Sequence, residues 1–148
     1  MYPLFEVESS GTYGTVYGHI VPADTGSLRE VVELIGKQFK RETRYDFAPF
    51  DSSNWDQEGV LFASNRFLAT FAIAAGAAGF AQENGTWWMD WIWIHPYERS
   101  SGLADRVWEE LEARYGKFHI DGPYSNAMAA LLRRHGVSPE RLNHELPT

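Results

Sequence analysis

The sequence predicts an α+β fold in which helices flank a mixed, mostly antiparallel sheet. Strand-like segments fill the middle of the chain, and an Asn84-Gly85 turn leads from them into a nearly continuous apolar run at 87–94. A strand this apolar is typical of one covered on both faces. From Leu103 to Tyr115 the apolar residues recur every four positions, as in an amphipathic helix. We therefore expect a strand, a short polar loop and a helix at the centre of the fold.

The length and composition of the chain fit one soluble domain. Its 148 residues, 44% of them hydrophobic, suffice for a single core spanning residues 1–148. The absence of cysteine excludes disulfides, thiolate metal sites and a cysteine nucleophile, and we expect no metal. The N-terminus lacks the basic start and apolar core of a signal peptide. The longest weakly polar run, 67–81, is shorter than the roughly 20 residues of a membrane span. We expect a cytoplasmic protein that does not bind membranes.

The net charge bears on the partners of the protein. A formal charge of −7, with no basic stretch to offset it, argues against binding to nucleic acid. The negative field instead favours a cationic small molecule or a lysine-rich partner.

Two strands and a helix are expected in the first third of the chain. Residues 4–8 and 13–21 alternate as two strands of a hairpin (2–21) about a Ser-Ser-Gly turn. Ser27, with Glu30 three positions later, predicts a capping box that opens a helix at 27–41. Residues 45–56 follow as a loop or a broken short helix, which either walls a binding site or is held to the core by its aromatic side chains.

The predicted core runs from residue 60 to residue 137. A short strand at 60–62 and a hairpin about Gly76, formed by 67–74 and 77–82, lead into the strand at 87–94 and complete a three-stranded meander. The many alanines and glycines at 72–81 predict a bulky partner opposite them, namely the tryptophans. After the central helix we expect a strand at 117–121, a break at Gly122-Pro123 and a helix capped by Ser125 or Asn126.

The loop at 97–102 has the chemistry of an anion site. The first N–H groups of a helix lack internal partners, and the helix dipole places partial positive charge there. Small residues such as Gly102 let the main chain approach a phosphate, and Arg99 adds a full charge. The alternative is an ordinary loop with a solvated arginine.

These residues resemble the acyl-CoA segment of the GNAT superfamily of N-acetyltransferases. The order Ile92-x-Ile94-x-Pro96-x-x-Arg99-x-x-Gly102-Leu103-Ala104 is similar to that family's strand, (Arg/Gln)-x-x-Gly-x-(Gly/Ala) loop and helix. The resemblance covers residues 60–137 and implies a three-layer fold whose central strand splays from its neighbour. It also implies acetyl-CoA as co-substrate and direct acetyl transfer to an amine, either a cationic small molecule or a lysine side chain. The implied cofactor-binding residues are Ile92, Trp93, Ile94, Arg99, Ser100, Ser101, Gly102, Leu103, Ala104 and Asn126.

Asp90 is the first candidate for the base that deprotonates the amine. It is the only charge within the apolar strand, and on simple alternation it shares a face with Trp88, Ile92 and Ile94. Burial there should raise its pKa toward a useful value. The alternative is that Asp90 accepts hydrogen bonds from a tryptophan or a neighbouring strand. Weaker candidates for a role in the chemistry are Glu83, His95, His119 and Asp121.

The chain departs from the family pattern in two places. In the last helix Arg133 stands where the family often has an acidic tyrosine, so Tyr124, Ser125 or water would have to protonate the thiolate. The residues after His135 are too few and too polar for the family's terminal hairpin. Either the N-terminal hairpin or a second subunit of a homodimer would then cover that sheet edge. These departures keep two alternatives open, namely an acyl-CoA-binding or regulatory module without efficient catalysis, and a structural domain with an aromatic interface.

Overall fold

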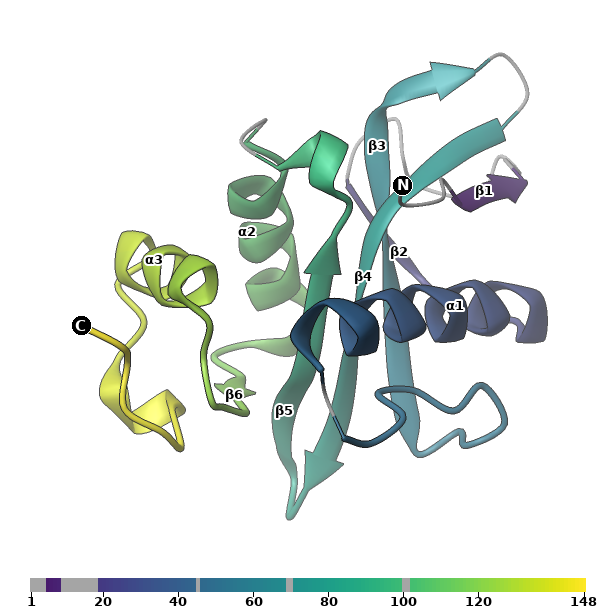
Figure 1. Cartoon of the computed structure of the whole chain (residues 1–148). Coiled ribbons are helices and arrows are strands. Elements are labelled where there is room, and N and C mark those ends of the chain that lie inside the picture. Colours follow the sequence, from purple (N-terminus) through teal and green to yellow (C-terminus); the bar gives the residue numbers. More distant parts are fainter. Residues whose placement is uncertain (1–4, 9–18, 45, 69–70, 100–101) are drawn as a thin grey trace.

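One sheet and three α-helices make up the described part of the chain, which comprises residues 5–8, 19–44, 46–68, 71–99 and 102–148 of the computed structural model (Figure 1). The elements are β1 (Phe5–Glu8), β2 (Ile20–Pro22), α1 (Gly26–Thr43), β3 (Gln57–Leu68), β4 (Phe71–Glu83), β5 (Thr86–Ile94), the 3-10 helix η1 (Pro96–Glu98), α2 (Leu103–Tyr115), β6 (His119–Ile120), α3 (Asn126–Arg134) and the 3-10 helix η2 (Pro139–Arg141).

The sheet is open and mostly antiparallel. Its strand order is β2-β3-β4-β5-β6, and β1 pairs with the first part of β4. The pair β5 and β6 is parallel, whereas the other pairs are antiparallel. This arrangement confirms the expected α+β class with a mixed sheet.

Helices cover both faces of the sheet and enclose two separate apolar clusters. On one face α1 contributes Val32 and Ile35, which lie in a cluster with Trp91 and Trp93 of β5. On the other face α2 and α3 pack against the sheet in a cluster whose members include Phe62, Phe80, Met89, Val107, Trp108, Leu111 and Leu132. In Figure 1 α1 runs in front of the sheet, and α2 and α3 lie to the left of β5.

The small residues of β4 accommodate the tryptophans of β5, as expected. A Cβ atom added at Gly79 would lie 2.2 Å from Nε1 of Trp91, so the indole occupies the space that a side chain would need. The same indole approaches Gly36 of α1. Glycine at position 79 therefore lets a large apolar side chain pack between the sheet and α1.

The predicted hairpin about Gly76 is wrong, because β4 runs through this position as one continuous strand. Gly76 pairs with Phe62 on one side and with Ile94 on the other. A Cβ atom at Gly76 would lie 2.2 Å from the carbonyl oxygen of Trp93. The glycine thus permits close approach of two strands and does not mark a turn. The link between β3 and β4 falls at residues 69–70, outside the described residues.

The N-terminal elements also differ from expectation. Within the described residues β1 pairs with β4 and β2 pairs with β3, so the two do not form a hairpin with each other. The predicted turn and most of the second predicted strand fall at residues 9–18, outside the described part. The cap of α1 is Thr25 and not Ser27, since the Thr25 side chain accepts a hydrogen bond from Leu28 N at 3.3 Å.

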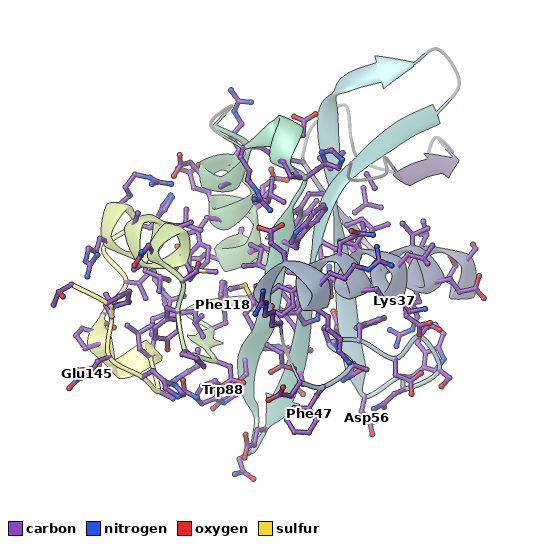
Figure 2. All side chains as sticks on the ribbon, viewed as in Figure 1. Lys37, Phe47, Asp56, Trp88, Phe118 and Glu145 are labelled. Carbon is purple, nitrogen blue, oxygen red and sulfur yellow. The ribbon has the colours of Figure 1, made fainter. Side chains whose placement is uncertain are left out.

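Residues 46–56 form the expected loop without helix or strand. Arg29, which is buried, holds it by donating to the carbonyl oxygens of Ser52, Asn54 and Gln57. Phe50 is buried, but Phe47 and Trp55 are 73% and 61% exposed (Figure 2). The loop is therefore held to the core mainly by an arginine, with only part of its aromatic set.

No strand hairpin follows α3, as expected, because residues 135–148 hold η2 and a single parallel bridge between Leu142 and Ile120. Buried Arg141 fixes this segment by donating to the Phe118 carbonyl oxygen and pairing with Glu112, both at 2.7 Å. The C-terminal segment, and not the N-terminal strands, thus meets the edge of β6. Within the described residues no helix is long and apolar enough to cross a membrane.

Candidate functional site

The parallel strands β5 and β6 pair at only two positions and then part. Trp88 pairs with His119 and Met89 with Ile120, and Asp121 N donates to Met89 O at 3.0 Å. β5 continues to Ile94, whereas the chain after β6 turns through Gly122-Pro123 toward α3. Within the described residues, no strand pairs with this edge of β5 beyond the contact with Asp121. The edge therefore offers backbone groups to an extended ligand.

Asp90 is a β-bulge at this point of divergence. Gly79 of β4 pairs with Trp91 and the next residue, Phe80, pairs with Met89, which leaves Asp90 without a partner in β4. A bulge re-aims the side chains on either side of it. At the bulge the alternation of faces along β5 shifts by one residue. Met89 and Ile92 therefore both lie on the α2 side of the sheet, whereas Trp91 lies on the α1 side. The expectation of simple alternation along β5 is therefore wrong at this position.

The electrostatic environment of Asp90 suits a general base. Partial burial, followed by the negative charges of Asp121 and Glu83, raises the pKa of Asp90 from 3.8 to about 6. This is the expected direction, because a desolvated carboxylate is less stable in its charged form. No hydrogen bond or ion pair joins Asp90 to another described residue, so the alternative of a tryptophan donor finds no support there. A carboxylate with this pKa is mostly ionised and still basic at neutral pH.

Asp121 faces Asp90 from the other side of the divergence. Its Oδ1 accepts a hydrogen bond from Asn143 Nδ2 at 2.6 Å, which fixes the side chain at the end of β6. Its charge is the second cause of the raised Asp90 pKa. Two carboxylates brought together from different strands create a negative potential, and such a potential favours a cationic ligand.

The start of α2 lies beyond the open edge of β5. Gly102 is the N-cap and adopts φ +83°, a conformation that favours glycine, and its neighbour Leu103 begins the helix. Gly102 has no side chain with which to cap this end of α2, and the first N–H groups, including those of Leu103 and Ala104, lack an intrahelical acceptor. Ser100 and Ser101, which the sequence assigns to the same anion site, lie outside the described residues.

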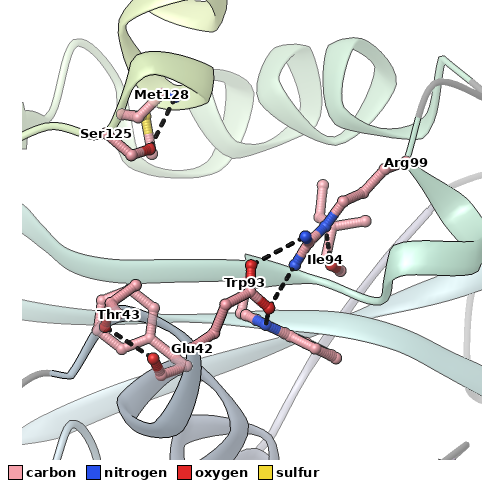
Figure 3. Close-up of polar contacts among 8 residues, drawn as sticks. Glu42, Thr43, Trp93, Ile94, Arg99, Ser125 and Met128 are labelled. Carbon is pink, nitrogen blue, oxygen red and sulfur yellow. Dashed lines mark hydrogen bonds and ion pairs between the residues drawn. The ribbon is translucent and has the colours of Figure 1, made fainter. Parts of the chain in front are cut away.

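Arg99 is only partly solvated, because its side chain is 42% exposed and its guanidinium is paired. Its NH1 and NH2 atoms each lie 2.9 Å from a different carboxylate oxygen of Glu42, and its Nε donates to Ile94 O at 2.7 Å (Figure 3). Trp93 Nε1 donates to the same carboxylate at 2.9 Å. Glu42 thus ties the last turn of α1 to the end of β5 and neutralises much of the Arg99 charge. An anion at this loop would depend chiefly on the main-chain N–H groups.

Tyr124 and Ser125, the predicted acids that follow β6, form mainly structural contacts. The Tyr124 hydroxyl donates to Ile120 O at 2.7 Å and accepts from Asn143 N at 3.0 Å, and burial raises its pKa. Ser125 Oγ accepts from Met128 N at 3.1 Å, so Ser125, and not Asn126, caps α3 (Figure 3). Asn126 is the exposed first residue of that helix.

The remaining candidates are Glu83, which lies at the surface, and His119 and His95, which pack against neighbouring side chains or lie buried in the fold. Glu83 is exposed at the hairpin end of β4, and His119 packs its ring on Trp88 with centroids 4.9 Å apart. His95 is buried, and its backbone N–H donates to Ala75 O at 2.7 Å.

Sequence reasoning missed the ion pairs that Glu42 and Asp105 form beside the site. Glu42 pairs with Arg99 across 57 positions, and Asp105 in the first turn of α2 contacts His135 Nε2 at 2.7 Å and Arg134 Nε at 3.2 Å. These ion pairs arise from the packing of separate elements, so no local sequence pattern predicts them.

No group of three or more metal-ligating side chains occurs in the described ranges. No protein-family model matches the chain, and no curated protein matches it in sequence. The function of the protein is therefore inferred from the geometry at the divergence of β5 and β6 and from the motif at 92–104.

Proposed function

We propose that the protein is an acyl-CoA-dependent N-acyltransferase of the GNAT type, which transfers an acetyl group from acetyl-CoA to a primary amine. One observation carries the proposal: the parallel strands β5 and β6 part at Asp90, directly before the loop and helix that resemble the family's acyl-CoA motif. A parallel pair that parts at this point, followed by an uncapped helix start, supplies both an edge for the pantetheine arm and N–H donors for the pyrophosphate.

In this proposal the backbone groups of Ile92, Trp93 and Ile94, except Ile94 O, which accepts from Arg99 Nε, pair with the pantetheine arm like an added strand. The N–H groups of Leu103 and Ala104 bind the pyrophosphate, with Gly102 allowing close approach. Asn126, exposed at the start of α3, lies on the opposite side of the divergence and contacts the same arm.

The proposed chemistry is a direct transfer. The acceptor arrives as an ammonium ion, drawn by the negative charges of Asp90 and Asp121, and Asp90 removes one proton directly or through water. The neutral nitrogen attacks the thioester carbonyl carbon and a C–N bond forms. The nitrogen then loses its second proton to water, and the C–S bond breaks with its electron pair leaving on sulfur. A backbone N–H of β5 stabilises the developing negative charge on the carbonyl oxygen.

The thiolate must finally gain a proton. The Tyr124 hydroxyl already donates to Ile120 O, so it is poorly available for this step. The Ser125 hydroxyl accepts from Met128 N and can still donate its own proton, because a hydroxyl is both donor and acceptor. We therefore assign the acid to Ser125 or to water.

The second candidate is an acyl-CoA-binding module without efficient turnover. It is favoured by Arg133, which stands at the position of the family's tyrosine and donates to Pro147 O, and by the hydrogen-bonded Tyr124 hydroxyl. Both candidates require acetyl-CoA to bind, and they differ only in transfer.

Titration calorimetry with acetyl-CoA and free CoA, followed by a transfer assay on polyamines, amino sugars and lysine peptides, tests the proposal. At a concentration of about 100 times its dissociation constant, acetyl-CoA should stabilise the protein by about 2.7 kcal/mol. Binding without transfer to any amine supports the module instead. The absence of heat and of a thermal shift with every acyl-CoA would exclude both.

A further inference from the structure

The solvent side of α1 carries three cations over its last two turns, and a fourth, Arg44, is the C-cap residue directly after the helix. Lys37, Lys40, Arg41 and Arg44, which we call the α1 basic face, are all exposed and line an open pocket of about 420 Å³. Figure 2 shows Lys37 on this helix, at the front of the view.

The spacing of these residues is unfavourable for the helix by itself. Lys37 and Arg41 stand four positions apart within α1, where like charges destabilise a helix. Lys40 and Arg44 form a second like-charged pair, of which only Lys40 is helical. Glu33, four positions before Lys37, instead accepts a hydrogen bond from Ser52 N at 2.8 Å. Within the described residues none of the four cations forms an ion pair or side-chain hydrogen bond.

The helix dipole accounts for only part of this arrangement. Basic side chains in the last turn stabilise a helix C-terminus, which applies to Lys40 and Arg41. Lys37 lies a turn earlier, beyond the reach of that effect. A like-charged cluster that local stability does not favour is the kind of local inconsistency expected at a functional surface.

The cluster also contrasts with the remainder of the protein. Four of the 13 basic residues lie here, so the rest of the chain, with nine basic and 20 acidic residues, carries a formal charge of −11. A long polyanion such as nucleic acid, or an anionic membrane, would have to lie against that negative remainder. A compact anion would meet only the basic face.

We propose that the α1 basic face binds a compact oligophosphate anion, independently of the acyl-CoA site. Lys37 to Arg41 extend over about 6 Å of helix, at a rise of about 1.5 Å per residue, and Arg44 follows at the C-cap, which suits an anion carrying several phosphate groups. Lysine and arginine donors form charge-assisted hydrogen bonds with phosphate oxygens. The bound anion would relieve the repulsion within both like-charged pairs.

Calorimetric titration with inorganic tripolyphosphate tests this site. The affinity of wild-type protein should fall as salt rises from about 0.05 to about 0.3 M, because exposed charges are screened. Lys37→Gln should weaken binding about tenfold and Lys37→Gln with Arg41→Gln about a hundredfold, the loss expected when charge-assisted hydrogen bonds are removed. The urea midpoints of both variants without ligand should equal or exceed that of wild type, since a like-charged pair is removed.

Lys117→Gln is the matched control, because Lys117 is 77% exposed and lies between α2 and β6, away from α1. It should leave tripolyphosphate affinity within about twofold, in keeping with the screening of distant charges. Saturating free CoA should leave the titration unchanged, which separates this site from the loop at 97–102. The proposal is overturned by an absence of binding, by equal loss in Lys117→Gln, or by displacement with CoA. Tighter binding of an acidic peptide or of duplex DNA than of tripolyphosphate would also overturn it.

Discussion

Glu42 and Arg99 form a two-point ion pair that ties the end of α1 to the residues just after β5, with both nitrogen–oxygen distances at 2.9 Å. The pair joins the helix on one face of the sheet to the loop that precedes α2. It also assigns Arg99 a structural partner inside the motif that the sequence associates with phosphate.

Arg99→Gln should therefore leave acetyl-CoA affinity within about threefold of wild type, since less than 1 kcal/mol of phosphate interaction is at stake when the guanidinium is already paired. The free energy of unfolding should fall by about 0.5–1 kcal/mol through loss of the partly exposed pair. Calorimetry and urea unfolding measure the two effects. A loss of affinity near a hundredfold would show that Arg99 binds the phosphate directly.

Asp90→Asn should separate chemistry from binding. Asn is nearly isosteric, so acetyl-CoA affinity should be retained, while the rate of transfer should fall about 100- to 10,000-fold with the loss of a general base. In wild type the rate should rise with pH through an apparent pKa of about 6, and this limb should vanish in the variant. Initial rates across pH 5–9, with Glu83→Gln as a control that keeps the base, provide the measurement. Full turnover by Asp90→Asn would remove Asp90 from the mechanism.

The same substitution should stabilise the protein at neutral pH. The raised pKa means that the folded state holds the Asp90 proton more tightly than the unfolded chain does, so stability from this group falls as pH rises from 3.8 to about 6. The full shift corresponds to about 3 kcal/mol, and partial exposure to water reduces this to about 1–2 kcal/mol. Asp90→Asn should gain that amount at pH 8 and nothing below pH 3.8, as measured by urea unfolding. Equal stability at both pH values would contradict the raised pKa.

Much of the fold followed from local signals in the sequence. The Asn84-Gly85 turn, with positive φ at both residues, the apolar β5 strand and the Gly116 end of α2 all depend on short-range chemistry. The prediction of a turn at Gly76 failed because a glycine in an apolar segment is compatible with either a turn or close packing of two strands. Which of the two applies depends on Trp93 in the neighbouring strand. The same limit applies to β1, whose pairing with β4 spans more than 60 positions.

The candidate site was predicted in its residues but not in its geometry. The raised pKa of Asp90 follows from one charge within an apolar strand, which the sequence displays. The bulge that re-aims Asp90 depends on the register between β4 and β5, and that register is a property of two strands. The partners of Arg99 and Tyr124 likewise come from distant segments, so the sequence could suggest their chemistry without showing that other contacts occupy them.

Tyr124→Phe should affect stability far more than turnover. The hydroxyl joins Ile120 O to Asn143 N, and its removal leaves the buried Ile120 carbonyl oxygen and the partly buried Asn143 N–H short of a partner. Such a loss costs about 1–3 kcal/mol, whereas the rate should stay within about threefold of wild type. Urea unfolding and initial rates test both parts. A fall in rate near a hundredfold with unchanged stability would restore Tyr124 as the acid.

Gly102→Ala should weaken acetyl-CoA binding specifically, and Gly136→Ala serves as its control. Both glycines adopt positive φ, +83° and +61°, and a Cβ atom would meet no atom closer than 3.8 Å at either position. Each substitution should therefore cost a similar amount of stability, about 1–2 kcal/mol, through backbone strain alone. Only Gly102 precedes the N–H groups of α2, so only its variant should lose acetyl-CoA affinity, by about tenfold or more, as one charge-assisted hydrogen bond is lost. Calorimetry at a temperature where both variants remain folded gives the comparison, and equal affinities in the two variants would place the phosphate elsewhere.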